Sequence, residues 1–218
     1  MTVDTLIYKS NTVQNITLKY LVYLPADYES SKGNYPLTLF LHGVGERGNN
    51  LDDLKRHGIP KCIESGKEFP FIVIAPQCPE GVWWSYRDYV FSLTALTRMI
   101  IKKYRVDSDR VYGTGLSMGG FGVLAMAIQD PDLFSAIVPI CGGADINKLQ
   151  RLSNLPIWLF HGLKDDVCPV ESSILIYKIL KKVNLNIKLK VYDNLEHDSW
   201  TKTYENNDVY EWLMSHTK

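Results

Sequence analysis

The sequence predicts an α/β protein: a mostly parallel central sheet with helices on both of its faces. Two observations predict this fold class. Short apolar segments alternate along the chain with segments of helical periodicity, and most of the apolar segments have no polar face, which is typical of parallel strands buried on both sides. The 218 residues, 45% of them hydrophobic, are enough for one sizeable core. We therefore expect a single domain over residues 1–218.

The predicted strands are of two kinds. Residues 17–24 (TLKYLVYL) alternate polar and apolar side chains, as expected of an antiparallel strand with one exposed face. The later strands are expected to be parallel. They are predicted at residues 37–41, 71–75, 111–116, 136–140, 157–160 and 187–192.

The predicted helices lie between these strands. Residues 89–104 place Leu93, Leu96 and Ile100 on one side of a helix. Residues 121–129 form a helical segment that ends before an Asp-Pro dipeptide, where helices stop. Two further helices are predicted at residues 170–182 and 204–216. No segment between these elements is long enough for a large lid domain, so we expect an open site.

Charge and N-terminal composition limit the partners. The chain has 24 basic and 24 acidic residues, and none of its Lys/Arg runs exceeds two residues, which argues against nucleic-acid binding. Residues 1–14 are polar and lack the pattern of a secretory signal. No apolar segment approaches the roughly 20 residues that span a membrane. We expect a cytoplasmic protein without a membrane partner, although a secreted form with its signal removed would look the same.

The cysteines do not suggest a metal or redox site. Cys62, Cys78, Cys141 and Cys168 are scattered, and no pair has C-x-x-C spacing. We expect four free, buried or half-buried thiols and no bound metal.

A serine nucleophile is predicted at the end of an apolar strand. Residues 115–119 read Gly-Leu-Ser-Met-Gly and match G-x-S-x-G, with a strand before the motif and a helix after it. In such a turn the serine has strained backbone angles, and the glycines allow the neighbouring elements to approach. An incidental serine in a glycine-rich turn is the structural alternative. A dinucleotide fingerprint is excluded because Met118 occupies the position of its third glycine. We predict that Ser117 is the nucleophile.

Two later segments supply a candidate acid and a candidate base. In hydrolases with this turn, both follow later strands, the acid first. Asp165 and Asp166 follow the strand at residues 157–160, and His197 follows the strand at residues 187–192. The imidazole accepts the serine proton, and a carboxylate orients the imidazole. We predict His197 as the base, while composition does not separate Asp165 from Asp166.

The other histidines have structural interpretations. His42 and His161 each end a strand before a glycine, and we expect them to anchor loops through hydrogen bonds. His57 and His216 lie in polar helical segments, and we expect them to be exposed.

An oxyanion hole is predicted from two backbone N–H groups. One belongs to Met118, the residue after the nucleophile, and the other to the glycine-rich loop at residues 42–48. An ordinary glycine-rich turn is the structural alternative for that loop. With Ser117 present, the Val44 N–H is the candidate second donor. Two such donors would stabilise the negative charge that develops on the carbonyl oxygen during acyl transfer.

Five motifs occur in order from about residue 21: LHGVGERG, APQCP followed by Trp83-Trp84, GLSMGG, HGLKDDVCPV and EHDSW. Together they resemble the carboxylesterase branch of the α/β-hydrolases, which includes phospholipase/carboxylesterase-like, feruloyl-esterase-like and prolyl-oligopeptidase-like hydrolases. The resemblance implies an acid two residues after His-Gly, which selects Asp165, and it supports Val44 as a donor. Asp166 and Cys168 depart from the usual pattern of the acid loop. Acyl-protein thioesterases in this branch usually have Gln in place of Met118, so that activity is disfavoured.

The resemblance implies a serine carboxylic ester hydrolase that needs no cofactor. We expect it to act on small-molecule esters with short or aromatic acyl groups, because the chain has no room for a lipase-like lid. Trp84 and Trp200 are candidates for stacking on the substrate, and packing in the core is the alternative for each. Two other functions remain: a small peptidase of the prolyl-oligopeptidase type, and a non-catalytic binding module. The sequence makes no prediction about oligomeric state.

Overall fold

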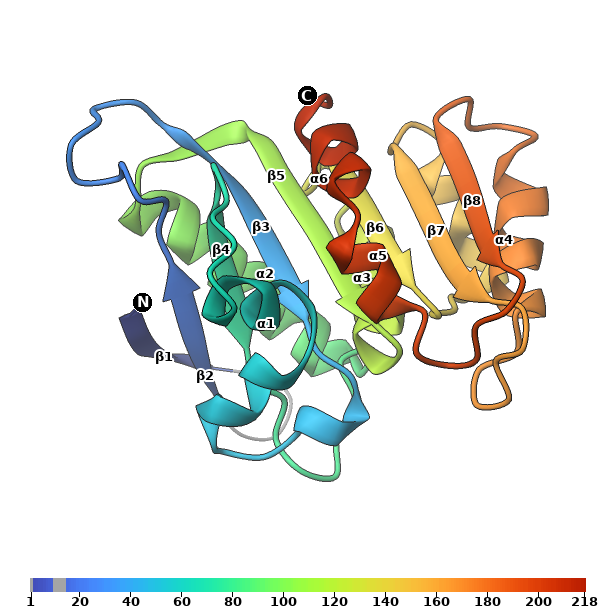
Figure 1. Cartoon of the computed structure of the whole chain (residues 1–218), viewed down its shortest axis with the longest axis horizontal. Coiled ribbons are helices and arrows are strands. Elements are labelled where there is room, and N and C mark those ends of the chain that lie inside the picture. The colour runs from blue at the N-terminus through green and yellow to red at the C-terminus, as the bar shows by residue number, and fades with distance from the viewer. Residues whose placement is uncertain (1, 10–14) are drawn as a thin grey trace.

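The predicted fold class is confirmed by a computed structural model, which describes residues 2–9 and 15–218 (Figure 1). An eight-stranded sheet has the order β1-β2-β4-β3-β5-β6-β7-β8. β1 and β2 pair antiparallel, as do β2 and β4, and the strands from β4 to β8 are parallel. The strands are β1 (Thr2–Lys9), β2 (Asn15–Tyr23), β3 (Tyr35–Leu41), β4 (Ile72–Pro76), β5 (Val106–Leu116), β6 (Ala136–Ile140), β7 (Ile157–Gly162) and β8 (Ile187–Tyr192).

Helices cover both faces of the sheet (Figure 1). One face packs against α2, α3 and α4, through a core that includes Leu96, Val123 and Ile176. The other face packs against α1, α5 and α6. The helices are α1 (Gly58–Glu64), α2 (Arg87–Lys103), α3 (Met118–Gln129), α4 (Glu171–Leu180), α5 (Trp200–Glu205) and α6 (Asn207–Met214). Short 3-10 helices are η1 (Val44–Glu46), η2 (Leu51–Arg56) and η3 (Ile146–Leu152).

Several elements differ from the predictions, among them β1, α1 and the pair α5 and α6. The edge strand β1 was not predicted, because its half-exposed, mixed sequence has only a weak apolar pattern. The predicted helix at residues 204–216 is two helices, since Asn206 interrupts it and its side chain accepts a hydrogen bond from the Asp208 N–H. Helix α1 was missed because its seven residues are too few for a clear period.

The topology brings distant segments to one edge of the sheet. The parallel strands all end there, so the loops after β3, β5, β7 and β8 lie close together. A buried hydrogen bond fixes one of these loops to the central strand: the hydroxyls of Tyr204 on α5 and Thr114 on β5 are 2.9 Å apart. Thr114 in turn donates to the Val138 carbonyl, 2.7 Å away. The segment before α5 is therefore held in a fixed position relative to the end of β5.

None of the helices formed by residues 2–9 and 15–218 has both the length and the apolar character needed to cross a lipid bilayer.

Candidate functional site

Ser117 lies in a strained turn between β5 and α3. Its backbone has φ 51° and ψ −118°, and a positive φ is uncommon for a residue other than glycine. Two glycines make the turn possible. A Cβ on Gly115 would lie 2.5 Å from the Gly119 carbonyl carbon, and a Cβ on Gly119 would lie 2.0 Å from the Leu41 carbonyl oxygen. Side chains at either position would push apart the strand and helix that hold the serine.

The structure brings Ser117, His197 and Asp165 into one hydrogen-bonded chain. His197 Nε2 is 3.0 Å from Ser117 Oγ, and His197 Nδ1 is 2.8 Å from Asp165 Oδ2. Because an ionised carboxylate only accepts hydrogen bonds, Nδ1 carries the imidazole proton. The lone pair of Nε2 then faces the serine hydroxyl, which donates to it. This arrangement can remove the hydroxyl proton as the oxygen attacks.

Asp165, and not Asp166, contacts the imidazole. The Asp165 side chain is fully buried, and its Oδ1 accepts hydrogen bonds from the N–H groups of Val167 (3.0 Å) and Cys168 (2.8 Å). Burial raises the pKa of Asp165, but the hydrogen bonds from His197 and these two N–H groups outweigh it and hold the pKa below its usual value. Asp165 is therefore ionised at neutral pH, whereas Asp166 is exposed.

A second histidine touches the same carboxylate. His161 Nε2 is 2.8 Å from the Cys168 carbonyl oxygen and 3.1 Å from Asp165 Oδ2. Both atoms are acceptors, so Nε2 carries the proton and Nδ1 accepts from the Ser173 hydroxyl, 2.7 Å away. The expectation that His161 anchors a loop is confirmed. The contact between His161 and Asp165 was not predicted. The signal available in the sequence was that the two residues are four positions apart, on either side of a turn.

Each of the two candidate oxyanion donors is the first residue of a helix. Met118 is the first residue of α3, and the exposed Val44 is the first residue of η1. N–H groups in a first helical turn have no partner within the helix, so they can bind an anion. The loop before η1 is held by the buried Glu46, whose Oε2 accepts from the Gly43 N–H at 3.0 Å. No sequence pattern indicated that Glu46 would hold this loop.

His42 anchors the same loop through hydrogen bonds, as predicted. Its Nε2 accepts from the Cys78 N–H at 2.9 Å, so its Nδ1 carries the proton and donates to the Gly43 carbonyl at 2.6 Å. Burial lowers the pKa of His42 to about 4, and the imidazole is therefore neutral at physiological pH.

The two tryptophan candidates occupy different positions. Trp84 is fully buried and donates from Nε1 to the His42 carbonyl at 3.2 Å, so it offers no exposed face to a ligand and its position fits the core-packing alternative. Trp200 is half-buried, and its ring lies edge-on to His197 at 5.1 Å between centroids. Trp200 also packs edge-on against His57, with 5.7 Å between the ring centroids.

The expectation that His57 and His216 are exposed is wrong. Both are half-buried. His57 packs on Trp200 and has its Nε2 3.7 Å from Glu46 Oε1. His216 packs on the Trp212 ring, with 4.5 Å between centroids. In each case a nearby indole covers one side of a residue that looked like part of a polar surface segment.

All four cysteines are free, with two buried and two half-buried, as predicted. Cys141 has φ 41°, and its thiol, Asp165 and His197 bring their potential ligand atoms within 4.8 Å of one another. Asp165 and His197 already share a hydrogen bond, and burial raises the pKa of Cys141, which disfavours the thiolate that a metal prefers. Cys168 is half-buried in the loop of Asp165, and burial, together with the Asp165 charge, raises the pKa of its thiol.

Comparison with known proteins agrees with the strand–serine–helix geometry. A model of the phospholipase/carboxylesterase family matches residues 89–216. The chain belongs to the phospholipase/carboxylesterase family. A crystal structure of a thermostable esterase is 30% identical and superposes with a TM-score of 0.83, covering 99% of this chain and 63% of that one. The predicted resemblance is thereby confirmed.

Curated relatives of this phospholipase/carboxylesterase family member are longer. A probable feruloyl esterase C from Aspergillus terreus is 30% identical over 173 residues, covering 76% of this chain and 62% of the relative. A dipeptidyl peptidase family member 1 from Caenorhabditis elegans is 22% identical over 204 residues, covering 77% of this chain but 25% of the relative. The chain thus spans less than two thirds of the length of either protein.

Burial of neutral His42 makes stability depend on pH. The pKa of His42 is about 4 in the folded state and near 6.5 when exposed, so the unfolded chain binds an extra proton between these values. The stabilisation is complete above about pH 6.5 and is lost as pH falls toward 4, by up to about 3 kcal/mol. Urea unfolding of wild type and His42→Gln from pH 4.5 to 7.5 measures this. The free energy of unfolding of the variant should fall less steeply with decreasing pH than that of wild type. The same pH dependence in both proteins would contradict the lowered pKa of His42.

Proposed function

We propose that this chain is a serine carboxylic ester hydrolase. One observation carries the proposal: Ser117, His197 and Asp165 form a continuous hydrogen-bonded chain, with the nucleophile in a strained turn. Ser117 Oγ attacks the ester carbonyl while His197 Nε2 takes its proton. Asp165 stabilises the imidazolium and keeps its Nδ1 proton directed at the carboxylate.

The attack places a negative charge on the carbonyl oxygen. The N–H groups of Val44 and Met118 are the proposed donors to this oxyanion. His197 then gives its proton to the departing alcohol, which leaves an acyl-enzyme on Ser117. Water, deprotonated by His197, attacks the acyl-enzyme and releases the acid. Side chains, backbone donors and water supply every step, so the proposal invokes no cofactor.

The proposed substrates are small-molecule esters with short or aromatic acyl groups. Trp200 supports an aromatic preference because it packs on His197 and is half-buried. Trp84 is fully buried and is not part of the proposed substrate pocket. Esterase activity is favoured over a peptidase activity because the relatives at 30% identity are an esterase and a probable feruloyl esterase, whereas the peptidase relative is 22% identical. A single catalytic domain over residues 1–218, a cytoplasmic location and the lack of nucleic-acid and membrane partners stay predictions.

The acid assignment can be tested with two neighbouring aspartates. Asp165→Asn should lower kcat by roughly 10⁴-fold, by analogy with the serine-protease acid, because the amide no longer holds the imidazole in its productive tautomer. Asp166→Asn, which changes an exposed side chain, should lower kcat by less than about threefold. Purified variants are compared on p-nitrophenyl acetate, with circular dichroism to verify folding. The reverse ranking would assign the acid to Asp166.

The substrate class can be tested with a panel of esters. We expect kcat/KM for acetyl, butyryl and feruloyl esters to exceed that for a palmitoyl ester by at least about tenfold, because the described residues 2–9 and 15–218 form no large lid over the site. Trp200→Ala should lower kcat/KM for the feruloyl ester by about two- to tenfold and leave the acetyl ester less affected. Trp83→Ala, which removes an indole that is exposed in the structure, is the matched control.

Three results would contradict this substrate assignment. They are highest activity on the palmitoyl ester, an unchanged profile in Trp200→Ala, and an equal loss in Trp83→Ala. Faster cleavage of a dipeptidyl p-nitroanilide than of any ester would instead favour the peptidase.

A further inference from the structure

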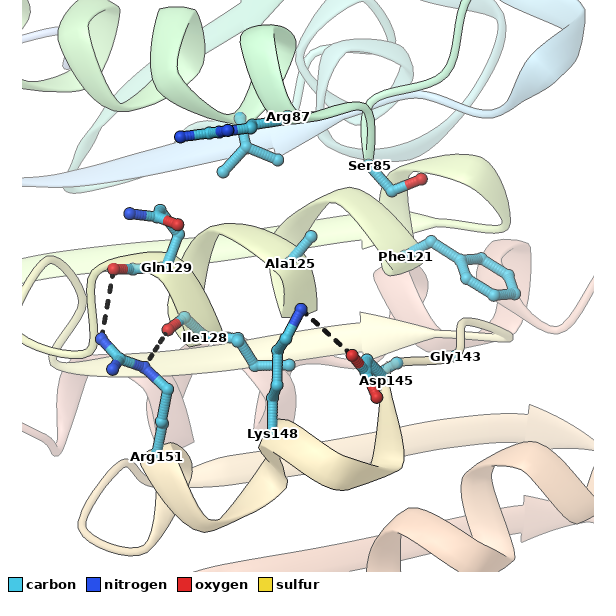
Figure 2. A pocket seen from close by; sticks show the side chains of 12 residues that line it. Ser85, Arg87, Phe121, Ala125, Ile128, Gln129, Gly143, Asp145, Lys148 and Arg151 are labelled. Carbon is cyan, nitrogen blue, oxygen red and sulfur yellow. Dashed lines mark hydrogen bonds and ion pairs between the residues drawn. The ribbon is translucent and has the colours of Figure 1, made fainter.

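A groove with a volume of about 930 Å³ runs along α3, and its described lining residues do not include Ser117, Asp165 or His197 (Figure 2). The apolar side chains of Phe121, Ala125 and Ile128 form its floor. Their i, i+4, i+7 spacing places them on one face of the helix. The start of α2 forms one wall, and the segment from β6 into η3 forms the other.

The near end of the groove is lined by Phe121, four residues after Ser117 in the sequence. Phe121 lies in the first turn of α3, and its N–H donates to the Ser117 carbonyl at 3.1 Å. Its ring covers Gly143, where a Cβ would lie 2.6 Å from the ring. The far end is marked by Gln129, which is about 12 Å farther along the helix from the helical rise. The groove thus follows α3 from Phe121, four residues after Ser117, to the end of the helix.

The walls of the groove carry excess positive charge. Arg87, Lys148 and Arg151 line it, while Asp145 is the one acidic side chain among its described lining residues. Lys148 Nζ is 3.1 Å from Asp145 Oδ2. This leaves a local formal charge of +2 on a chain whose formal net charge is zero.

The far cationic wall is fixed in place. Arg151 donates from Nε to the Ile128 carbonyl (2.5 Å) and from Nη2 to the Gln129 carbonyl (3.4 Å), so its guanidinium lies over the end of α3 (Figure 2). Arg87 approaches from the first turn of α2, on the opposite wall. A ligand between these walls meets positive charge from both sides.

We propose that this groove binds the distal part of an elongated ester whose acyl or alcohol arm ends in a carboxylate. This inference rests on the proposed ester hydrolysis at Ser117. The apolar floor accommodates a ring or hydrocarbon spacer, and the cationic walls bind the terminal anion. A neutral hydrocarbon arm would desolvate the polar wall groups without giving them a partner, and a cationic arm would be repelled.

Two matched pairs of esters test the inference and distinguish the arms. For the alcohol arm, 4′-acetoxybiphenyl-4-carboxylate is compared with its carboxamide. For the acyl arm, the p-nitrophenyl monoester of decanedioic acid is compared with its monoamide. Within each pair the members differ in charge at the remote end and share the scissile bond. Each is assayed with wild type and the double variant Arg87→Gln/Arg151→Gln, which removes the cation argued for each wall, at low salt and in about 0.5 M NaCl.

Wild type should favour the carboxylate of one pair by about five- to tenfold in kcat/KM at low salt, and the pair that responds identifies the arm. The preference should fall close to one in the double variant and in high salt. Lys102→Gln, at the opposite end of α2, should retain it. All of these proteins should hydrolyse p-nitrophenyl acetate equally, because that ester is too short to reach the walls.

Equal rates within both pairs, or a preference that survives in the double variant, would overturn the groove assignment while leaving ester hydrolysis intact. Failure of wild type to hydrolyse p-nitrophenyl acetate would instead contradict the proposed function, and this inference with it.

Discussion

The backbone of Ser117 adopts φ 51° and ψ −118° because three chain segments meet there at backbone contact distance. Gly119 lies against the Leu41 carbonyl at the end of β3, and Gly115 lies against Gly119. Close approach of β3, β5 and α3 therefore fixes the direction of the serine hydroxyl. The same approach brings the end of β3, from which the chain leads to η1 and Val44, next to the turn that holds Ser117. Both proposed oxyanion donors thus begin at elements that this pair of glycines allows to meet.

Asp165 connects the rest of the site to this turn. Its buried carboxylate accepts two backbone N–H groups of its own loop, the Nδ1 proton of His197 and a close approach from His161. These donors keep the carboxylate ionised in a buried position, where an unpaired charge would be strongly unfavourable. His161 also binds the Cys168 carbonyl and the Ser173 hydroxyl, so it joins β7, the acid loop and α4. The orientation of His197 therefore depends on the contacts that hold Asp165, including those that His161 makes with the acid loop and α4.

Much of this arrangement could be predicted from local sequence. The bounds of β6 and β8 agree with the predicted strands, and the order of Ser117, Asp165 and His197 follows from where the later strands end. The choice between Asp165 and Asp166 could not be made from composition, because adjacent identical residues differ only in the direction that the folded loop gives them. The resemblance selected Asp165, and this is the aspartate that the structure places against His197.

Long-range packing explains most of what the sequence did not predict. Trp84 was a candidate for stacking on the substrate, with core packing as the alternative, and its indole is buried, with its Nε1 donating to the His42 carbonyl. His57 and Trp200 are far apart in sequence and meet only when α1 and α5 pack on the same face of the sheet. The groove along α3 combines side chains from α2, α3 and η3, and no single segment indicated it.

The central claim is that His197 activates Ser117 as a nucleophile. Reaction with a fluorophosphonate probe, followed by peptide mass spectrometry, tests this most directly, because the probe reacts with activated serines. We predict a single label per chain on the peptide that contains Ser117, strongly reduced in His197→Ala and absent from heat-unfolded protein. An unlabelled wild type, a label on another residue, or undiminished labelling of Ser117 in His197→Ala would contradict it.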